Sequence, residues 1–205
     1  MKELHASWQY AGIEWLIQYY EINNFSNLHT YSISKHCASH GLELLLKAMV
    51  IKIKRNEESV KSFGHDLKRI ITELNHYAAV EDKLELRLDL FDAIQIDSKQ
   101  MTPHQMLKLQ GKYKCSLGEI EYYTLIKYCG DLKYLGLPIK ASKSGATHTA
   151  NEDPNVFLGK EVRKMLNFLG HREKDVYYGH LQNLIRVMAK KRPWMKDYLL
   201  TTFVL

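Results

Sequence analysis

The sequence predicts an all-α protein, and three observations support this fold class. Proline occurs only four times in 205 residues, and each one lies at or near a plausible boundary between elements: Pro103, Pro138, Pro154 and Pro193. The long stretches between these prolines carry apolar residues at helical spacing. No strong strand pattern, hairpin signal or internal repeat accompanies them.

The first two predicted helices contain the most informative pattern in the chain. The first runs from about 3 to 21, has an aromatic-rich apolar surface, and ends at Asn23 and Asn24. The second covers 33–54 and is apolar over most of its circumference, as is typical of a helix in the middle of a bundle. At 100° per residue, five polar side chains of this helix fall within about 60° of one another; they are His36, His40, Glu43, Lys47 and Lys54. Such a stripe must reach solvent through a groove or find partners inside, so we expect a site there.

The middle of the chain alternates predicted helices with less regular segments. A polar loop at 56–62 precedes a helix that starts near Gly64 and Asp66 and repeats apolar residues at helical spacing. Residues 80–114 are predicted to be helical or irregular, because their apolar residues alternate as in a strand although helix formers dominate. Ser116 and Glu119 have the spacing of a capping box and predict the start of a tyrosine-rich helix.

The last third of the chain is predicted to hold a loop and further helices. The tyrosine-rich helix ends near Gly136 and Pro138, and 140–152 has the composition of a functional or disordered loop. Pro154, after an N-capping aspartate, predicts the start of another helix. Gly170 is a point where this helix can be interrupted before 177–190 continues.

Composition limits the classes of function. A chain of 205 residues with 45% hydrophobic residues is long enough for a single domain over 1–205. The net charge of +6 favours nucleic acid or other anionic partners, with a solvated basic surface as the alternative. Three cysteines without a CxxC pair are typical of a reduced cytosolic protein, and no apolar stretch is long enough for a membrane span. We therefore expect a cytoplasmic protein without a membrane partner.

The polar stripe offers two kinds of chemistry. His36, His40 and Glu43 are potential metal ligands on successive turns of one helix face, but a metal site in a bundle usually needs ligands from a second helix. No matching second motif is found, so we expect polar contacts, no metal and no cofactor. Glu43 and Lys47 are spaced i and i+4, which predicts either a surface ion pair or a cleft where Lys47 meets a phosphate.

Further candidates lie at helix ends. Asp66 is predicted to cap the helix that it opens, while His65 either packs at the helix entry or acts as an acid or base with a partner. Lys133, beside Tyr134, complements the dipole at a helix C-terminus. No GxxxxGK[ST], GxGxxG or GxSxG motif is present, which argues against Walker-type and serine-based chemistry.

Three of these segments, in this order, resemble the HEPN superfamily of helical "higher eukaryotes and prokaryotes nucleotide-binding" domains. They are ASHGLELLLKA at 38–48, GHDL at 64–67 and DLKY at 131–134, where family members often have a short (R/K)Y element. The resemblance covers about 32–138 and leaves 153–205 as a helical extension. It implies an antiparallel bundle of four or five helices, often dimeric, that binds nucleotides or RNA. Many relatives work beside a nucleotidyltransferase or inside toxin and phage-defence systems.

The resemblance also implies a possible activity, because a large branch of the family consists of metal-independent ribonucleases with an R-x(4–6)-H site. Arg69 and His76 form one formal match, although Ile70 stands where relatives usually carry a polar residue. Our preferred hypothesis is a non-catalytic or accessory module that binds a nucleotide, RNA or another anionic ligand. Its candidate ligand-binding residues are His36, His40, Glu43, Lys47, His65, Asp66, Lys133 and Tyr134. The alternatives are a ribonuclease that uses Arg69 and His76, and a homodimeric scaffold without a small-molecule site.

Overall fold

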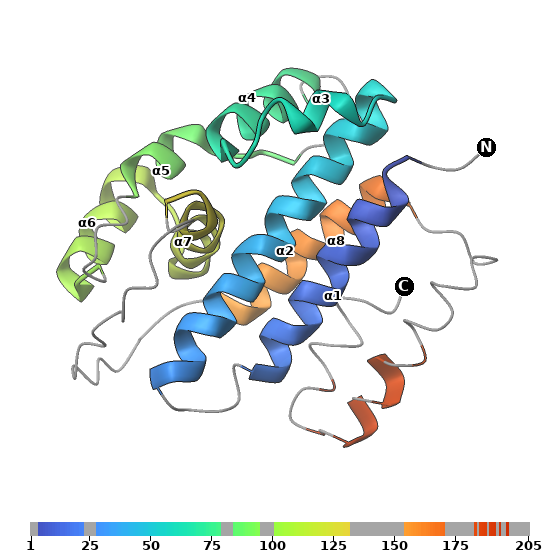
Figure 1. The fold of residues 1–205 in the computed structure, drawn as a ribbon. Helices are drawn as coiled ribbons and strands as arrows, with labels where there is room; N and C mark the ends of the chain where they lie inside the picture. The colour runs from blue at the N-terminus through green and yellow to red at the C-terminus, as the bar shows by residue number, and fades with distance from the viewer. Residues whose placement is uncertain are drawn as a thin grey trace.

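The computed structural model describes residues 4–22, 28–78, 84–94, 101–131 and 154–170, together with isolated positions between 183 and 196. These residues are helical or irregular and contain no strand, which confirms the predicted all-α class. The helices pack against one another as a bundle (Figure 1). They are α1 (Ala6–Ile22), α2 (Leu28–Lys54), α3 (Glu58–Lys61), α4 (Leu67–Ala78), α5 (Leu88–Ala93), α6 (Pro103–Tyr113), α7 (Leu117–Asp131) and α8 (Pro154–Leu169).

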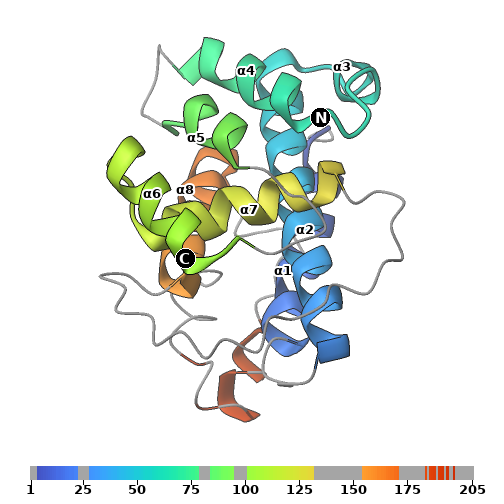
Figure 2. The same ribbon diagram turned by 90° about the vertical axis from the view of Figure 1, so that its left-hand side faces the viewer.

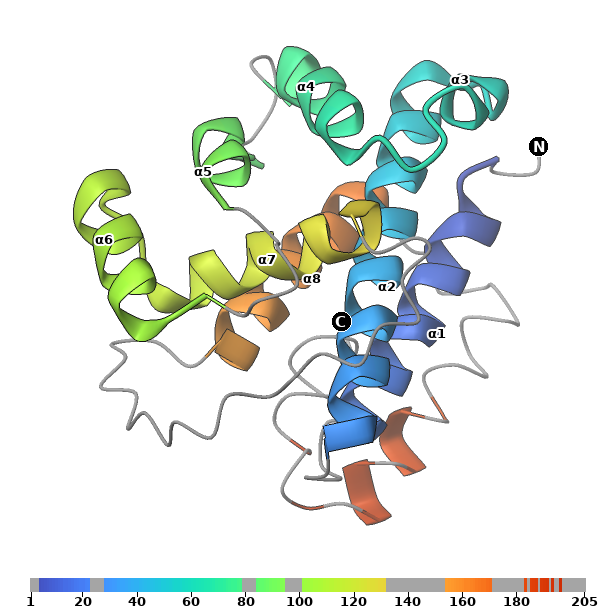
Figure 3. The same ribbon diagram turned by 60° about the vertical axis from the view of Figure 1, so that its left-hand side comes forward.

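Helix α2 is the central element of this bundle. It contacts α1, α3, α4, α7 and α8, and Figure 3 shows it running past the end of α7 with α1 alongside. The apolar side chains that cover most of its circumference are buried, as the sequence predicts; they include Cys37, Ala38, Leu42, Leu45, Leu46, Ala48, Met49 and Ile51. The helix begins at Leu28, five residues earlier than predicted, so its polar stripe starts about two turns inside the helix and runs to its last residue, Lys54.

Helices α1 and α2 form an antiparallel pair whose backbones approach closely at two glycines. A Cβ atom added at Gly12 would lie 3.0 Å from the carbonyl oxygen of Gly41, and one added at Gly41 would lie 2.9 Å from that of Gly12. Neither residue has a side chain to hold the helices apart. The close approach places the exposed face of α1 directly beside the polar stripe of α2.

The C-terminus of α8 is held by side chains from α1 and α2. Lys52 Nζ donates to the carbonyl oxygens of Phe168 at 2.6 Å and Leu169 at 2.8 Å, which have no partner within their own helix. Gln9 Nε2 donates to the carbonyl oxygen of Gly170 at 3.0 Å. Gly170 has a φ of +73°, a left-handed conformation that ends a helix, so the predicted interruption coincides with the end of α8.

Helices α5, α6 and α7 form the other side of the molecule. Helix α7 crosses α2 and contacts α8, and both α5 and α6 pack against α7 (Figure 2). Residues 80–114 are predicted to be helical or irregular, and the described residues of this range form α5 and α6, with a non-helical segment at 84–87 before α5. In that segment Leu84 and Leu86 are buried and Glu85 is exposed, which explains the strand-like alternation of the sequence.

Two further elements differ from the predicted ones. Thr102 Oγ1 accepts from the backbone N–H of Gln105, whose side chain accepts from the backbone N–H of Thr102, so a full capping box starts α6 where none was predicted. Within the predicted loop 56–62, four residues form the short helix α3. The predicted loop at 140–152 lies outside the described residues. None of the helices among the described residues is long and apolar enough to cross a membrane.

Candidate functional site

A fully buried carboxylate lies at the centre of the polar stripe. Glu43 has no exposed surface, although the sequence also allowed a surface position for it and Lys47. Lys47 Nζ donates to Glu43 Oε1 at 2.5 Å, and Lys47 is itself only 6% exposed. The alternative of a surface ion pair is therefore wrong. We call Glu43, Lys47, His40 and His65 the Glu43 cluster.

The rings of His40 and His65 both turn Nδ1 toward the Glu43 carboxylate. His65 Nδ1 lies 2.9 Å from Glu43 Oε1 and 3.1 Å from Oε2. His40 Nδ1 lies 3.7 Å from Oε2, which is an electrostatic contact beyond hydrogen-bond distance. The cluster thus joins three positions of α2 to a residue that precedes α4.

The pKa of Glu43 reflects these contacts. Burial by itself raises the pKa of a carboxyl, but the neighbouring groups of His40, Lys47 and His65 outweigh this effect and hold the pKa of Glu43 well below its usual range. Glu43 is therefore ionised at neutral pH and balances the charge of the buried Lys47 ammonium. An enclosed carboxylate that is ionised at neutral pH is poorly suited to donate a proton, and Glu43 instead holds the side chains of Lys47 and His65 in place.

The turn before α4 positions His65. Gly64 has a φ of +54°, in the left-handed region that glycine adopts without steric cost. Asp66 Oδ1 accepts from the backbone N–H of Arg69 at 3.0 Å, which confirms the predicted cap of α4. His65 lies between the turn and the cap, and its side chain, 37% exposed, reaches back to Glu43.

The outer part of the stripe is aromatic. The rings of His36 and His40 stack with an interplanar angle of 2° and centroids 6.0 Å apart. Trp15, on α1, meets both rings edge-on, with centroids 6.0 Å from His36 and 5.0 Å from His40. We call the surface formed by Trp15, His36, His40 and His65 the imidazole face. Burial lowers the pKa of His36, the neighbouring His40 lowers it further, and Glu43 opposes both.

The other basic residues of the stripe are engaged below or beside this face. Lys47 Nζ lies 5.7 Å from the ring centroid of Trp8, and the Trp8 indole donates to Glu57 Oε1 at 2.9 Å. Lys47 is consequently covered on this side by α1. Lys54, the last residue of the stripe, pairs with Glu73 of α4 at 2.7 Å. The stripe therefore divides into an enclosed charged part and an outer aromatic part.

The candidate ribonuclease pair lies on α4. The Arg69 guanidinium packs over the ring of Phe63 at 4.7 Å, and the His76 ring contacts that of Tyr77. Both Arg69 and His76 are exposed. Seven residues are close to two turns of α-helix, so both side chains start from the same side of α4, and each packs on its own aromatic neighbour.

Two of the predicted site residues, Lys133 and Tyr134, lie outside the described residues. Among the residues that the structure describes, no three side chains of His, Cys, Asp or Glu converge closely enough to hold a metal ion as they stand. The structure thus brings together His36, His40, Glu43, Lys47 and His65, with Asp66 as the neighbouring cap.

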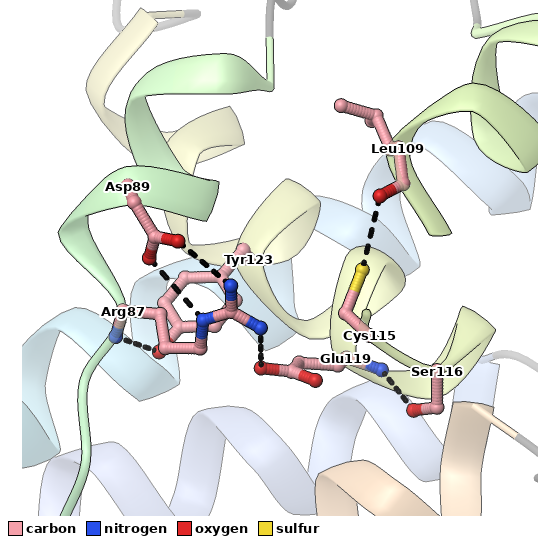
Figure 4. Close-up of polar contacts among 7 residues, drawn as sticks. All are labelled: Arg87, Asp89, Leu109, Cys115, Ser116, Glu119 and Tyr123. Atoms are coloured by element: carbon pink, nitrogen blue, oxygen red, sulfur yellow. Dashed lines mark hydrogen bonds and ion pairs between the residues drawn. The ribbon is translucent and has the colours of Figure 1, made fainter. Parts of the chain in front are cut away.

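A second polar cluster was not predicted from the sequence. Figure 4 shows Arg87, which precedes α5, between the carboxylates of Asp89 and Glu119. Its Nη2 lies 2.7 Å from Asp89 Oδ2, and its backbone N–H donates to the Tyr123 hydroxyl at 2.5 Å. Arg87 therefore links the start of α5 to α7. The only signal in the sequence is a single arginine in an alternating segment, too little to indicate partners 32 and 36 residues away.

The start of α7 confirms the serine half of the predicted capping box. Ser116 Oγ accepts from the backbone N–H of Glu119 at 3.1 Å, as expected at the start of a capping box. The Glu119 carboxylate contacts Arg87 Nη1 at 3.4 Å. Because the guanidinium of Arg87 is held by two carboxylates, this cluster is a structural connection, and the imidazole face is the better candidate for a functional site.

Comparisons of the chain with protein-family models, with curated proteins and with solved structures found no match.

Proposed function

We propose that the chain is a non-catalytic or accessory module of the HEPN type that binds a nucleotide, RNA or another anionic ligand on the imidazole face. The observation that carries this proposal is the Glu43 cluster, in which a buried carboxylate orients two partly exposed imidazoles beside an exposed tryptophan. The residues of the Glu43 cluster come from two of the three segments on which the family resemblance rests, ASHGLELLLKA and GHDL.

The chemistry of the imidazole face suits a ligand with an anionic group and an aromatic ring. Imidazole N–H groups donate to phosphate oxygens, and both ring nitrogens donate when the ring is protonated. Trp15 is 36% exposed and provides an aromatic surface on which a base can stack. The net charge of +6 favours the approach of an anion from a distance.

The charged residues beneath the face support it without contacting the ligand. Glu43 and Lys47 neutralise each other and are almost completely enclosed. A ligand would thus meet rings of His36, His40 and His65, while the ion pair fixes the position of two of them. This assigns Lys47 a supporting role, in place of the direct phosphate contact that the sequence also allowed.

The proposal is tested by fluorescence anisotropy with a labelled single-stranded RNA of about 12 nucleotides and with AMP and ATP as competitors. His40→Ala and Trp15→Ala should each weaken binding by about 5- to 150-fold, because a lost stacking or charge-assisted contact is worth roughly 1–3 kcal/mol. His104→Ala is the matched control, since His104 is an exposed histidine on α6 and should leave the affinity unchanged.

The outcomes separate the three hypotheses. Equal binding by wild type, His40→Ala and Trp15→Ala would refute the imidazole face as the site. Cleavage of the RNA during the assay, abolished by His76→Ala, would indicate the ribonuclease alternative. Absence of binding to all of these ligands, together with a homogeneous dimer in solution, would favour the scaffold.

A further inference from the structure

A helical segment near the C-terminus is anchored to the body of the molecule by its apolar side. The structure describes 183, 185–187 and 189–191 of this segment, and all of these positions are helical. Ile185 and Ala189 are buried and belong to the hydrophobic core. Figures 1 and 3 show the segment, in red, near the end of the α1–α2 pair where α1 ends and α2 begins.

The other side of this segment is basic. Arg186, Lys190 and Lys191 are exposed, and at 100° per residue they lie roughly 80–140° from the buried edge of the helix. Arg186 and Lys190 are spaced i and i+4, so their side chains are neighbours on the helix surface. No ion pair or hydrogen bond joins the three cations to another residue that the structure describes. Their charges are therefore available to an anion from outside the chain.

The sequence around these cations contains no carboxylate that could balance them locally. Between Val176 and Lys196 there is no aspartate or glutamate, whereas the same stretch holds Arg186, Lys190, Lys191, Arg192 and Lys196. Like charges at i and i+4 repel each other and destabilise a helix. A bound polyanion would remove this repulsion by neutralising both charges.

Other helices of the chain balance surface lysines with a carboxylate three residues earlier. Lys61 pairs with Glu58 on α3 at 2.5 Å, and Lys164 pairs with Glu161 on α8 at 2.6 Å. Such pairs of opposite charge are typical of a helix surface that faces only solvent. The exposed side of the C-terminal segment has cations without these partners, which favours an anionic ligand over a merely solvated face.

We propose that Arg186, Lys190 and Lys191 form a C-terminal basic surface that binds the phosphate backbone of single-stranded RNA. Lysine and arginine contacts with phosphates supply most of the affinity of sequence-independent binding to nucleic acid. Arginine binds a phosphate through two parallel N–H donors, and Lys190 follows Arg186 about 6 Å further along the helix axis. The proposal rests on the proposed function for the class of ligand, but its residues lie outside the imidazole face.

The test is fluorescence anisotropy with a labelled single-stranded RNA of about 12 nucleotides, repeated at salt concentrations from about 50 to 200 mM. Because binding releases counterions, the logarithm of the affinity falls against the logarithm of the salt concentration by about 0.7 per phosphate contact. The triple variant Arg186→Gln/Lys190→Gln/Lys191→Gln should make this slope shallower by about 2. It should also lower the affinity at about 50 mM salt by at least about tenfold.

The matched control is Lys108→Gln/Lys112→Gln/Lys114→Gln, which changes exposed lysines on α6 and at its C-terminus. Each triple variant removes three positive charges and lowers the net charge from +6 to +3. The control should change the slope by less than about 0.7, the value of one contact. All six substitutions replace exposed side chains, so the circular dichroism spectrum and the melting temperature should remain those of the wild type.

The proposal is overturned if the C-terminal triple variant binds RNA with the affinity and slope of the wild type, or if the α6 control loses as much. It is also overturned if the wild type binds no RNA, including the case in which it binds vesicles of about 30% phosphatidylserine instead. His40→Ala and Trp15→Ala separate this proposal from the proposed function. Weaker binding in these two variants alone supports only the imidazole face, and weaker binding in the C-terminal triple variant alone supports only the C-terminal basic surface.

Discussion

At the scale of single residues, the Glu43–Lys47 pair is notable for its burial. Two ions removed from water carry a large desolvation penalty, and only their mutual contact with additional hydrogen bonds offsets it. Glu43 obtains such bonds from Lys47 and from His65. Loss of one ion would leave the other buried without a counter-charge, which is more costly than loss of both.

We therefore expect Glu43→Gln to lower the free energy of unfolding by about 3–5 kcal/mol in urea denaturation, because Lys47 loses its counter-ion. The double variant Glu43→Gln/Lys47→Met should recover a large part of this loss, since it removes the unpaired ammonium. A double variant as unstable as Glu43→Gln alone would contradict this explanation.

The chain provides a matched control for this prediction. Glu58 and Lys61 also form an ion pair at 2.5 Å, but their side chains are 71% and 57% exposed. Glu58→Gln should therefore change the free energy of unfolding by less than about 1 kcal/mol. Because the N–O distance is 2.5 Å in both pairs, the difference between the two variants in free energy of unfolding measures the effect of burial.

At the scale of elements, the pairing of α1 with α2 depends on the absence of side chains at Gly12 and Gly41. A Cβ at Gly41 would lie 2.8 Å from Leu16 Cγ and 2.9 Å from the backbone oxygen of Gly12. A side chain can move, but the backbone of a packed helix cannot do so without disturbing its neighbours. Separation of these helices would also move Trp15 away from His36 and His40.

Gly41→Ala should accordingly lower the free energy of unfolding by about 1–3 kcal/mol, although alanine has the higher helix propensity. Gly111→Ala is the control, because a Cβ at Gly111 of α6 meets nothing within 4 Å. That variant should be as stable as the wild type or gain up to about 1 kcal/mol. Thermal or chemical denaturation of both proteins distinguishes the two cases, and a neutral Gly41→Ala would contradict the close packing.

The features predicted correctly from the sequence are those that depend on residues close together in the chain. The apolar circumference of α2, the Asp66 cap and the end of α8 before Gly170 each depend on residues within a few turns. The segment before α5 was ambiguous, because the alternation of Leu84 and Leu86 belongs to a non-helical stretch that is followed immediately by a short helix.

The candidate site could be predicted only in part. Helical geometry placed His36, His40, Glu43 and Lys47 on one stripe, but not the partner from outside α2. The contact between His65 and Glu43 joins residues 22 positions apart and depends on the packing of α4 against α2. Trp15 belongs to the aromatic-rich apolar surface predicted for 3–21, and its contact with two imidazoles follows from the close approach of α1 and α2 at two glycines.

At the scale of the whole molecule, α2 combines the core of the bundle with the candidate site. Its apolar circumference anchors it to α1, α7 and α8, and its polar stripe carries the Glu43 cluster. The cluster ties α2 to the start of α4, so the imidazole face lies where three elements meet: α1, α2 and the turn before α4. A site built on packed helices is held more rigidly than one built on a loop.

The most direct test of the imidazole face as the binding site is a long-range ¹H–¹⁵N spectrum of protein labelled at histidine, recorded during titration with single-stranded RNA. We expect the ring signals of His36, His40 and His65 to shift together and to saturate at one ligand concentration. The signals of His76 and His104, exposed on α4 and α6, should stay in place. Saturable shifts confined to His76 or His104, with the three rings of the imidazole face unchanged, would contradict the account.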